Sequence, residues 1–181
     1  MIPEIKIDHI EKNPFSRPGE KLVKVKAIIW HYTACPKASA KNIRDYFNNL
    51  KKQTEYKSRY ASAHYAIDEK EIIEIIPTDE VAYHVGAPKN KYTEIAKSFG
   101  NISPNYYTIG IELCHDRDDG YINNATLVNA VLLTQELLSK FNLTTENLFR
   151  HYDITGKNCP KYFVENIIEW KNIKEVISGN R

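Results

Sequence analysis

The run Val23-Lys24-Val25-Lys26-Ala27-Ile28-Ile29-Trp30-His31 is the most strand-like stretch of this chain. Its β-branched and aromatic side chains favour the extended conformation, and a strand turns alternate residues to opposite faces. One face of the predicted strand carries Val25, Ala27, Ile29 and His31. The strand therefore ends on a histidine that continues an otherwise apolar face.

A second strong strand is predicted over Tyr107–Cys114. Its two faces carry Ile109, Ile111 and Leu113 on one side and Thr108, Gly110, Glu112 and Cys114 on the other. Glu112 thus lies opposite the apolar face, near the end of the strand. Its neighbour Gly110 has no side chain, which we expect to leave space for a ligand.

The rest of the chain alternates helical and strand-like segments without an internal repeat. The predicted elements are a helix over Ser39–Lys52, a hairpin of Tyr60–Asp68 with Glu71–Ile76, a helix from Asn124 or Thr126 to Phe141, and a closing helix over Tyr162–Ile177 with Phe163, Ile167, Trp170 and Ile177 on its core face. The stretch Pro77–Tyr106 is rich in loops, and a loop of that length is typical of the wall of a binding cleft. This order predicts an α/β fold with a mixed central sheet flanked by helices.

Length and composition favour a single domain over residues 1–181. Residues 1–20 are predicted to be an extended lead-in, because three prolines interrupt them, and residues 178–181 are typical of the start of a linker. Apolar residues make up 42% of the chain and charged residues 27%, as in an ordinary globular protein. Twelve tyrosines are a modest enrichment that could line a polar groove.

The charge and cysteine content exclude several classes of protein. A net charge of +2 and a pI near 8.3 fall well short of the basic surface that nucleic-acid binding requires. Three cysteines are an odd number, so a fully disulfide-paired scaffold is excluded. No apolar run approaches the length of a membrane span, and no hydrophobic signal segment opens the chain. We therefore expect a monomer that is made in the cytoplasm and does not insert into a membrane.

The segment Arg150-His151-Tyr152-Asp153-Ile154-Thr155-Gly156-Lys157-Asn158-Cys159-Pro160 places an imidazole and a thiol eight residues apart. Both groups bind zinc well, and a loop that contains glycine can bring both to one ion. His31 would be a third ligand, which leaves the fourth tetrahedral position open, as in catalytic zinc sites. The pair alone is weak evidence, since a buried cysteine is usually a small hydrophobe and a loop histidine is usually solvated. Together with Glu112 at a strand end and Lys157 inside the loop, it predicts a zinc hydrolase.

Five short elements together resemble the zinc-dependent N-acetylmuramoyl-L-alanine amidases. That family includes phage endolysins of the amidase type and shares its fold with the peptidoglycan-recognition proteins. The matching elements are Ile28-Ile29-Trp30-His31-Tyr32-Thr33-Ala34, Ala61-Ser62-Ala63-His64-Tyr65, Ala82-Tyr83-His84-Val85-Gly86, Ile109-Gly110-Ile111-Glu112, and His151-Tyr152-Asp153 through Cys159-Pro160. They occur in the family's order and span nearly the whole chain.

The resemblance implies a role for seven residues. The implied zinc ligands are His31, His151 and Cys159, the implied catalytic residues are Glu112 and Lys157, and the residues implied to lie in or beside the cleft and contact substrate are His64 and His84. One departure matters: some members carry a catalytic tyrosine just before the hairpin histidine, where this chain has Ala63. Others rely on a glutamate at the position of Glu112, and this sequence is similar to those.

Each role has a structural alternative. Glu112 is the best candidate for general base and later proton donor, but a carboxylate at a strand end can also form a salt bridge. Lys157 could neutralise a developing oxyanion, or it could be a solvated loop lysine. His84 could hydrogen-bond substrate or only brace its loop. His64 lies in an apolar hairpin, where the alternative is a structural role or a contact that orients a metal ligand.

The resemblance implies hydrolysis of the amide bond between N-acetylmuramic acid and L-alanine in bacterial peptidoglycan. The setting it suggests is an endolysin catalytic domain that reaches the cell wall after release from the host cytoplasm. A non-catalytic peptidoglycan-binding module is disfavoured, because such relatives lose the metal cysteine and Cys159 is present. A cytoplasmic amidase that recycles muropeptides stays open, since the start of the chain fits either setting. A structural zinc domain would need a fourth Cys or His ligand close by.

Overall fold

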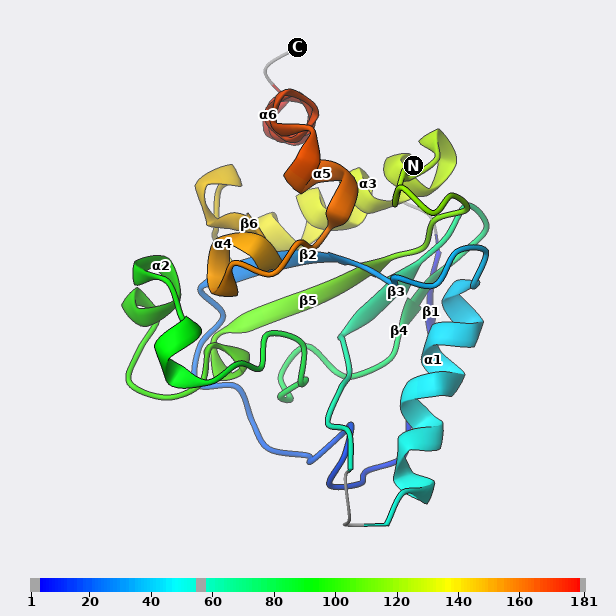
Figure 1. Cartoon of the computed structure of the whole chain (residues 1–181), viewed down its shortest axis with the longest axis vertical. Helices are drawn as coiled ribbons and strands as arrows, with labels where there is room; N and C mark the ends of the chain where they lie inside the picture. Colours follow the sequence, from blue (N-terminus) through cyan, green and yellow to red (C-terminus); the bar gives the residue numbers. More distant parts are fainter. Residues whose placement is uncertain (1–3, 55–57, 180–181) are drawn as a thin grey trace.

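Six short strands form one mixed sheet in the computed structural model, which describes residues 4–54 and 58–179 (Figure 1). The strands are β1 Ile5–Ile7, β2 Ala27–Tyr32, β3 Tyr65–Ile67, β4 Ile72–Glu74, β5 Thr108–Leu113 and β6 Leu148–Arg150, in the spatial order β1-β4-β3-β5-β2-β6. The hairpin of β3 with β4 is antiparallel, and the other described pairs are parallel. Parallel neighbours require long crossover connections, which here carry the helices.

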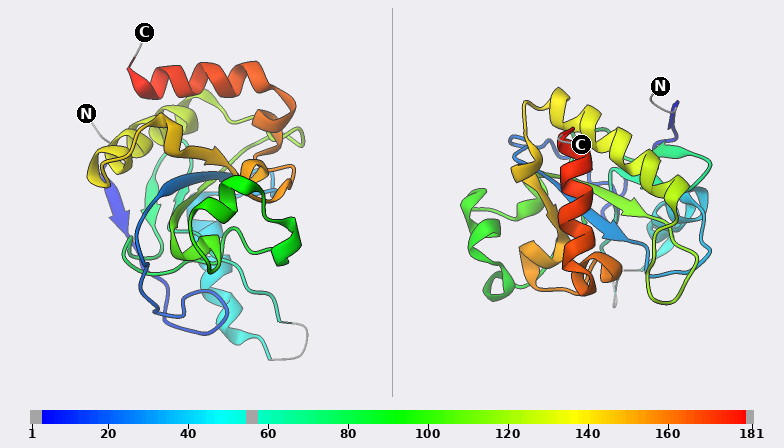
Figure 2. Two further views of the ribbon diagram at one scale, coloured as in Figure 1. Left: turned by 90° about the vertical axis from the view of Figure 1, so that its left-hand side faces the viewer. Right: turned by 90° about the horizontal axis from the view of Figure 1, so that it is seen from above.

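The helices lie on both faces of the sheet. They are α1 Ala40–Asn49, α2 Glu94–Ser98, α3 Asn124–Lys140, α4 His151–Thr155, α5 Lys161–Glu165 and α6 Ile167–Ser178, with 3₁₀ turns at Leu50–Lys52, Lys89–Lys91, Pro104–Tyr106 and Thr145–Asn147. Helices α3 and α6 pack together over one face, above the sheet in Figure 1 and again side by side in Figure 2. Helix α1 packs against β3 and β4 from the opposite face, while α2 contacts α4 at the other end of the sheet.

The predicted faces of the two central strands are confirmed within β2 and β5, but Val25, which precedes β2, packs with Ile28 and Trp30 and not on the predicted face of Ala27 and Ile29. The apolar face of β5 and the side chains of Ile28 and Trp30 lie in the core beneath α3 and α6, whereas Ala27 and Ile29 face the other side. Trp30 is the anchor of this core: its ring lies 5.8 Å from that of Phe163 and 5.7 Å from that of Trp170. Its indole N–H donates to the hydroxyl of Thr134 at 3.0 Å, so the one polar atom of the ring is paired.

Two strands were not predicted. The lead-in contributes β1, which pairs in parallel with β4 at one edge of the sheet. At the other edge, β6 pairs in parallel with β2. Each has three residues, which is too short for an alternating pattern to be distinguished from a loop. In the same region His151 begins the short helix α4, so its predicted place in a loop was wrong.

Other boundaries also differ from the predictions. Strand β2 begins at Ala27 rather than at Val23, and the hairpin strands are shorter than expected. The cap of α3 is Asn123, whose side chain accepts from the backbone N–H of Thr126. The closing helix is interrupted at Asn166, which divides it into α5 and α6 and leaves Ile167 45% exposed instead of in the core.

Only the first part of the predicted linker at 178–181 can be described. Ser178 ends α6 and Gly179 caps it in the left-handed conformation, at a φ of 75°. Residues 180–181, like residues 1–3 of the lead-in, lie outside the described residues. Within the described part of the chain, no helix is long and apolar enough to cross a membrane.

Candidate active site

The pairing of three parallel strands brings the predicted site residues to one edge of the sheet. Strands β2 and β5 pair with His31 directly opposite Glu112. On the other side of β2, Trp30 is opposite Arg150, so His151 follows at the level of His31. Since paired residues of parallel strands point to the same face, His31 and Glu112 lie side by side.

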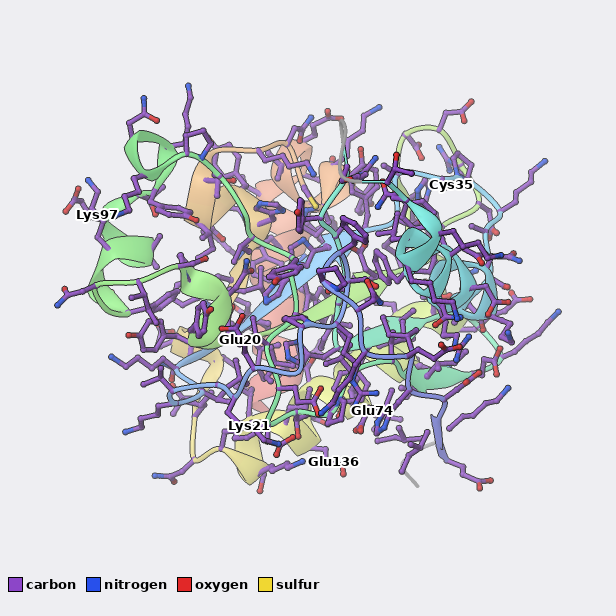
Figure 3. All side chains as sticks on the ribbon, turned by 90° about the horizontal axis from the view of Figure 1, so that it is seen from below. Glu20, Lys21, Cys35, Glu74, Lys97 and Glu136 are labelled. Carbon is purple, nitrogen blue, oxygen red and sulfur yellow. The ribbon has the colours of Figure 1, made fainter. Side chains whose placement is uncertain are left out.

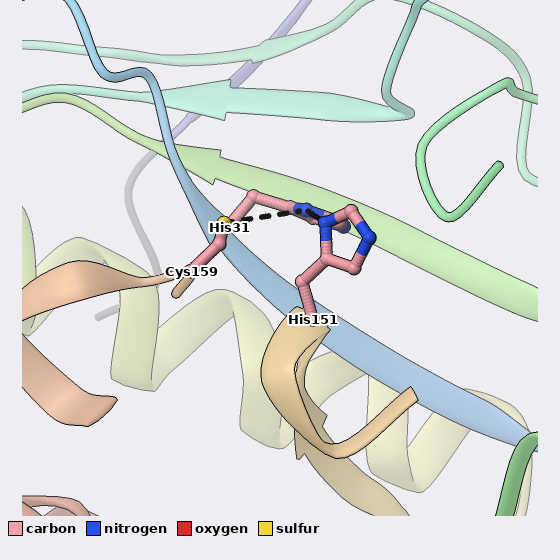
Figure 4. Close-up of side chains that lie close together, drawn as sticks. All are labelled: His31, His151 and Cys159. Atoms are coloured by element: carbon pink, nitrogen blue, oxygen red, sulfur yellow. Dashed lines mark hydrogen bonds between the residues drawn. The ribbon is translucent and has the colours of Figure 1, made fainter. Parts of the chain in front are cut away.

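His31, His151 and Cys159 form a compact group of buried donors (Figure 4). The Nδ1 atom of His31 lies 3.1 Å from Nδ1 of His151 and 3.8 Å from Sγ of Cys159. All three ligand atoms lie within 4.8 Å of one another. The three residues predicted to bind metal are thus together, and they could hold one ion.

Burial keeps the two imidazoles of this group neutral. It lowers the pKa of His151 to about 3, with the charge of Lys157 acting in the same direction. Burial also holds the pKa of His31 well below its usual value, and the neighbouring histidines add to the effect. A neutral imidazole keeps one nitrogen lone pair, which is what a metal ion requires.

The thiol of Cys159 is held in its protonated form until a cation is near. Burial raises its pKa to about 12, and the charge of Glu112 adds to this rise. The backbone N–H of Tyr32 and the charge of Lys157 oppose it. Metal binding by this group would therefore release a proton, because the ligand is the thiolate.

Glu112 lies at the floor of the cleft with one enclosed oxygen. Its Oε2 atom is buried and has no hydrogen-bond partner among the described residues. Burial raises the pKa of Glu112 to about 8, while the positive charges of Lys157 and Arg59 limit the rise. A buried carboxyl oxygen without a partner is costly, and such atoms are found where a ligand or reaction needs them.

The loop that carries Cys159 is fixed by Arg150, a residue that the sequence did not single out. The buried guanidinium donates to both carboxylate oxygens of Asp153, from Nε at 3.1 Å and from an Nη atom at 2.7 Å, and another Nη atom donates to the backbone oxygen of Phe163 at 3.0 Å. Within the loop, the N–H of Tyr152 donates to the oxygen of Cys159 at 2.9 Å. Asp153 therefore holds Arg150 rather than the ring of His151.

A cleft of about 280 Å³ opens over the donor group. His31, His151, Cys159, Glu112, His84 and the exposed Lys157 all line it. The sequence did not assign a role to the other polar residues that line the cleft: Tyr32, Thr33, Tyr46, Arg59, Tyr60, Ser62, Tyr83 and Asn105. The only hint was the number of tyrosines, four of which line this cleft.

The two remaining predicted histidines have different positions. His84 lines the cleft, and its Nδ1 atom lies 3.0 Å from the Nε2 atom of His31. Its ring also fills the space above Gly110 that we expected a ligand to occupy: a Cβ atom on Gly110 would lie 2.5 Å from the ring. His64 is fully buried and does not line the cleft.

The ring of His64 is engaged on both sides by backbone. Its Nδ1 accepts from the N–H of Gly110 at 3.0 Å, and its Nε2 donates to the oxygen of Glu80 at 2.9 Å. Burial lowers the pKa of this imidazole to about 4. These contacts favour the structural interpretation of His64 over a substrate contact.

The other two cysteines lie away from the donor group. Cys35 is exposed near the start of α1 (Figure 3), and Cys114 is buried just after β5. Burial raises the pKa of the Cys114 thiol, which leaves it inert at neutral pH. Neither belongs to the group of residues that could hold a metal.

Comparison with known proteins gives concordant results. A family model described as N-acetylmuramoyl-L-alanine amidase matches residues 21–162. The chain is 40% identical over 166 residues to the N-acetylmuramoyl-L-alanine amidase CwlL of Bacillus licheniformis, which covers 92% of this chain and 44% of CwlL. The structure of the catalytic domain of XlyA is similar at a TM-score of 0.73 and 26% identity, covering 96% of this chain and 99% of that domain. A mutant endolysin from Bacillus subtilis is similar at a TM-score of 0.74 and 28% identity, covering 96% and 98%.

Fold, site and comparisons together define a single α/β domain of the amidase type. The chain belongs to the N-acetylmuramoyl-L-alanine amidase family, which confirms the resemblance predicted from the sequence. It spans less than half the length of the curated relatives CwlL, at 44%, and BlyA of Bacillus subtilis, at 47%.

The raised pKa of Glu112 predicts a specific dependence of stability on pH. Because the folded state holds this proton up to about pH 8 and the unfolded state loses it near 4.5, Glu112 lowers the stability of the metal-free protein increasingly as pH rises between these values. Glu112→Gln removes that loss, and should raise the free energy of unfolding at pH 8 by on the order of a few kcal/mol. Urea unfolding of both proteins in chelator measures the difference.

The buried histidines do not obscure this comparison. Their pKa values are lowered on folding, so they favour the folded state as pH rises towards 6.5 and add no further slope above it. They are also the same in both proteins. If wild type and Glu112→Gln kept a constant stability difference from pH 5 to pH 8, the carboxyl group would not have the raised pKa.

Proposed function

We propose that this chain is a catalytic domain that hydrolyses the amide bond between N-acetylmuramic acid and the L-alanine of the stem peptide in bacterial peptidoglycan. The observation that carries this proposal is the buried group of His31, His151 and Cys159, which lies with Glu112 at the floor of an open cleft. Membership of the amidase family supports the choice of bond. The near-complete match to the catalytic domain of XlyA supports a self-contained domain over residues 1–181.

We propose Zn²⁺ as the ion, because the donor set and its spacing fit it. A tetrahedral zinc ion sets two ligand nitrogens about 3.4 Å apart and a nitrogen and a sulfur about 3.6 Å apart, from bond lengths of about 2.1 and 2.3 Å. The observed separations of 3.1 and 3.8 Å are close to both values. When bound, zinc supplies a Lewis acid that activates water near neutral pH and polarises the scissile carbonyl.

Glu112 is proposed to move the proton during hydrolysis. Its carboxylate takes a proton from the attacking water and returns it to the nitrogen of the leaving L-alanine. Because the burial of Glu112 favours the protonated state, the proton stays on the carboxyl group long enough to be delivered. A cation among the neighbouring donors would restore the ionised form at the start of each cycle.

Lys157 is proposed to stabilise the carbonyl oxygen as it gains negative charge. The residue lies on the loop between His151 and Cys159 and lines the cleft. Its charge lowers the pKa values of Glu112, His151 and Cys159 alike, which supports an electrostatic role for its ammonium group in the cleft. A positive charge held beside the reacting carbonyl lowers the barrier without a further rearrangement.

The endolysin setting is proposed from the structural relatives. The mutant endolysin from Bacillus subtilis matches the chain over nearly the full length of both proteins. In this setting the substrate is the intact cell wall, and the tyrosines and Arg59 of the cleft offer apolar and hydrogen-bonding surface to glycan and peptide.

Digestion of purified sacculi tests the function and the metal together. The zinc-loaded protein should release stem peptides with a free L-alanine amino terminus and leave the lactyl group on the muramic acid, as mass spectrometry would show. Cys159→Ser should lose most of the zinc and nearly all activity. Cys35→Ser is the matched control, since that thiol is exposed and outside the donor group. Cleavage of another bond, or full activity after complete removal of metal, would refute the proposal.

Glu112 and Lys157 should affect turnover without affecting the metal content. Glu112→Gln should lower kcat by roughly 10²-fold or more, as expected for loss of a general base. Lys157→Met should lower kcat by about 10- to 1000-fold, the range for loss of one group that stabilises an oxyanion. Lys171→Met, at an exposed position on α6, is the control for a general charge effect. Wild-type turnover of either site variant at full zinc content would remove that residue from the mechanism.

A further inference from the structure

His84 is held in one orientation by three separate contacts. The side-chain oxygen of Asn105 accepts from the backbone N–H of His84 at 3.1 Å and from that of Val85 at 2.9 Å. The ring lies against Gly110, where any larger residue would collide with it. On the far side of the ring, Nε2 lies 3.0 Å from the hydroxyl and 3.3 Å from the backbone oxygen of Thr108. These contacts fix the direction in which each ring nitrogen of His84 points.

The partners of His84 determine where its proton lies. The hydroxyl of Thr108 donates to the backbone oxygen of Pro104 at 2.9 Å, so it can only accept from His84. The backbone oxygen of Thr108 can also only accept. Nε2 of His84 must therefore carry the N–H, and in the neutral imidazole Nδ1 carries the lone pair. That lone pair faces Nε2 of His31 at 3.0 Å.

The tautomer of His84 in turn determines the tautomer of His31. Because Nδ1 of His84 accepts, Nε2 of His31 donates. The neutral ring of His31 has one N–H, which leaves a lone pair on Nδ1, and Nδ1 is the atom that faces His151 and Cys159. Without the constraint, a free imidazole can place its proton on either nitrogen, and the other tautomer would point an N–H at the metal position.

We propose that His84 and Thr108 are positioning residues that fix His31 as the tautomer able to bind metal. The chain of donors runs from His31 through His84 and Thr108 to the backbone oxygen of Pro104. The position of the His84 ring also gives a reason for a glycine at position 110, on the same face of β5 as Glu112. Any side chain there would occupy the space that the ring fills. This inference rests on the proposed metal centre and assigns His84 to the metal ligand rather than to the substrate.

Zinc affinity, measured by competition with a chelator, tests this chain of donors, the His31–His84–Thr108 relay, independently of activity. Loss of a group that orients a metal ligand costs about 10- to 100-fold in affinity, and we expect this loss for His84→Phe. His84→Asn offers an acceptor near the position of Nδ1 and should recover much of it. Thr108→Val should show a smaller loss, because the backbone oxygen at 3.3 Å remains, while Thr108→Ser keeps the hydroxyl and should bind as wild type.

The tautomer of His31 provides a second readout. Long-range ¹H–¹⁵N spectra of metal-free wild type at neutral pH should show His31 protonated at Nε2 and not at Nδ1. In Thr108→Val, which keeps the size of the buried side chain, the other tautomer should become detectable. Protonation of Nδ1 in wild type, or equal zinc affinity of His84→Phe, Thr108→Val and wild type, would overturn the relay alone. A wild type that binds no zinc would overturn the metal centre itself and the relay with it.

Discussion

The in-register pairing of β5, β2 and β6 is the constraint on which the site depends. It sets Glu112 beside His31 and brings His151 to the same level at the end of β6. A shift of β2 by one residue against its neighbours would turn His31 into the core beneath α3 and Trp30 into the cleft. The packing of Trp30 against Phe163 and Trp170 opposes that shift, because the shift would remove its ring from the core beneath α3 and α6. The apolar core thus sets the geometry of the polar site on the opposite face.

The protonation states of the buried groups in the site favour the binding of a cation. Two buried imidazoles are held neutral, a buried thiol is held protonated, and a carboxyl group has an enclosed oxygen without a partner among the described residues. Each of these groups is disfavoured by burial in its charged form, and a cation at their centre would reverse that preference for the thiol and the carboxyl group. Metal binding and the protonation of Glu112 are therefore coupled. One ion would favour the deprotonated form of both the Cys159 thiol and the Glu112 carboxyl group.

The sequence predicted the parts of this arrangement that local pattern encodes. Strands β2 and β5 are each long enough to show alternation, which gave the face of its own strand on which His31 and Glu112 each lie. That the two residues share one face of the sheet follows from the pairing of the strands, which alternation does not show. The spacing of His151 and Cys159 indicated a shared ion because their loop is short. Strand β6 has too few residues to show a period, so the route by which His151 reaches His31 was not visible. The ring of His84 over Gly110, its contacts with Thr108 and Asn105, and the clamp of Arg150 on Asp153 are contacts between distant segments or within a turn, and no local spacing predicts them.

The position of the ion is the most direct test of these relations. Anomalous diffraction at the zinc absorption edge, from crystals of the zinc-loaded protein, would locate it without reference to activity. We expect one strong peak per chain, within bonding distance of Nδ1 of His31, Nδ1 of His151 and Sγ of Cys159, with Glu112 beside it and not bound to it. A peak elsewhere, or one bonded to Nε2 of His31 or to His84, would contradict the arrangement described above.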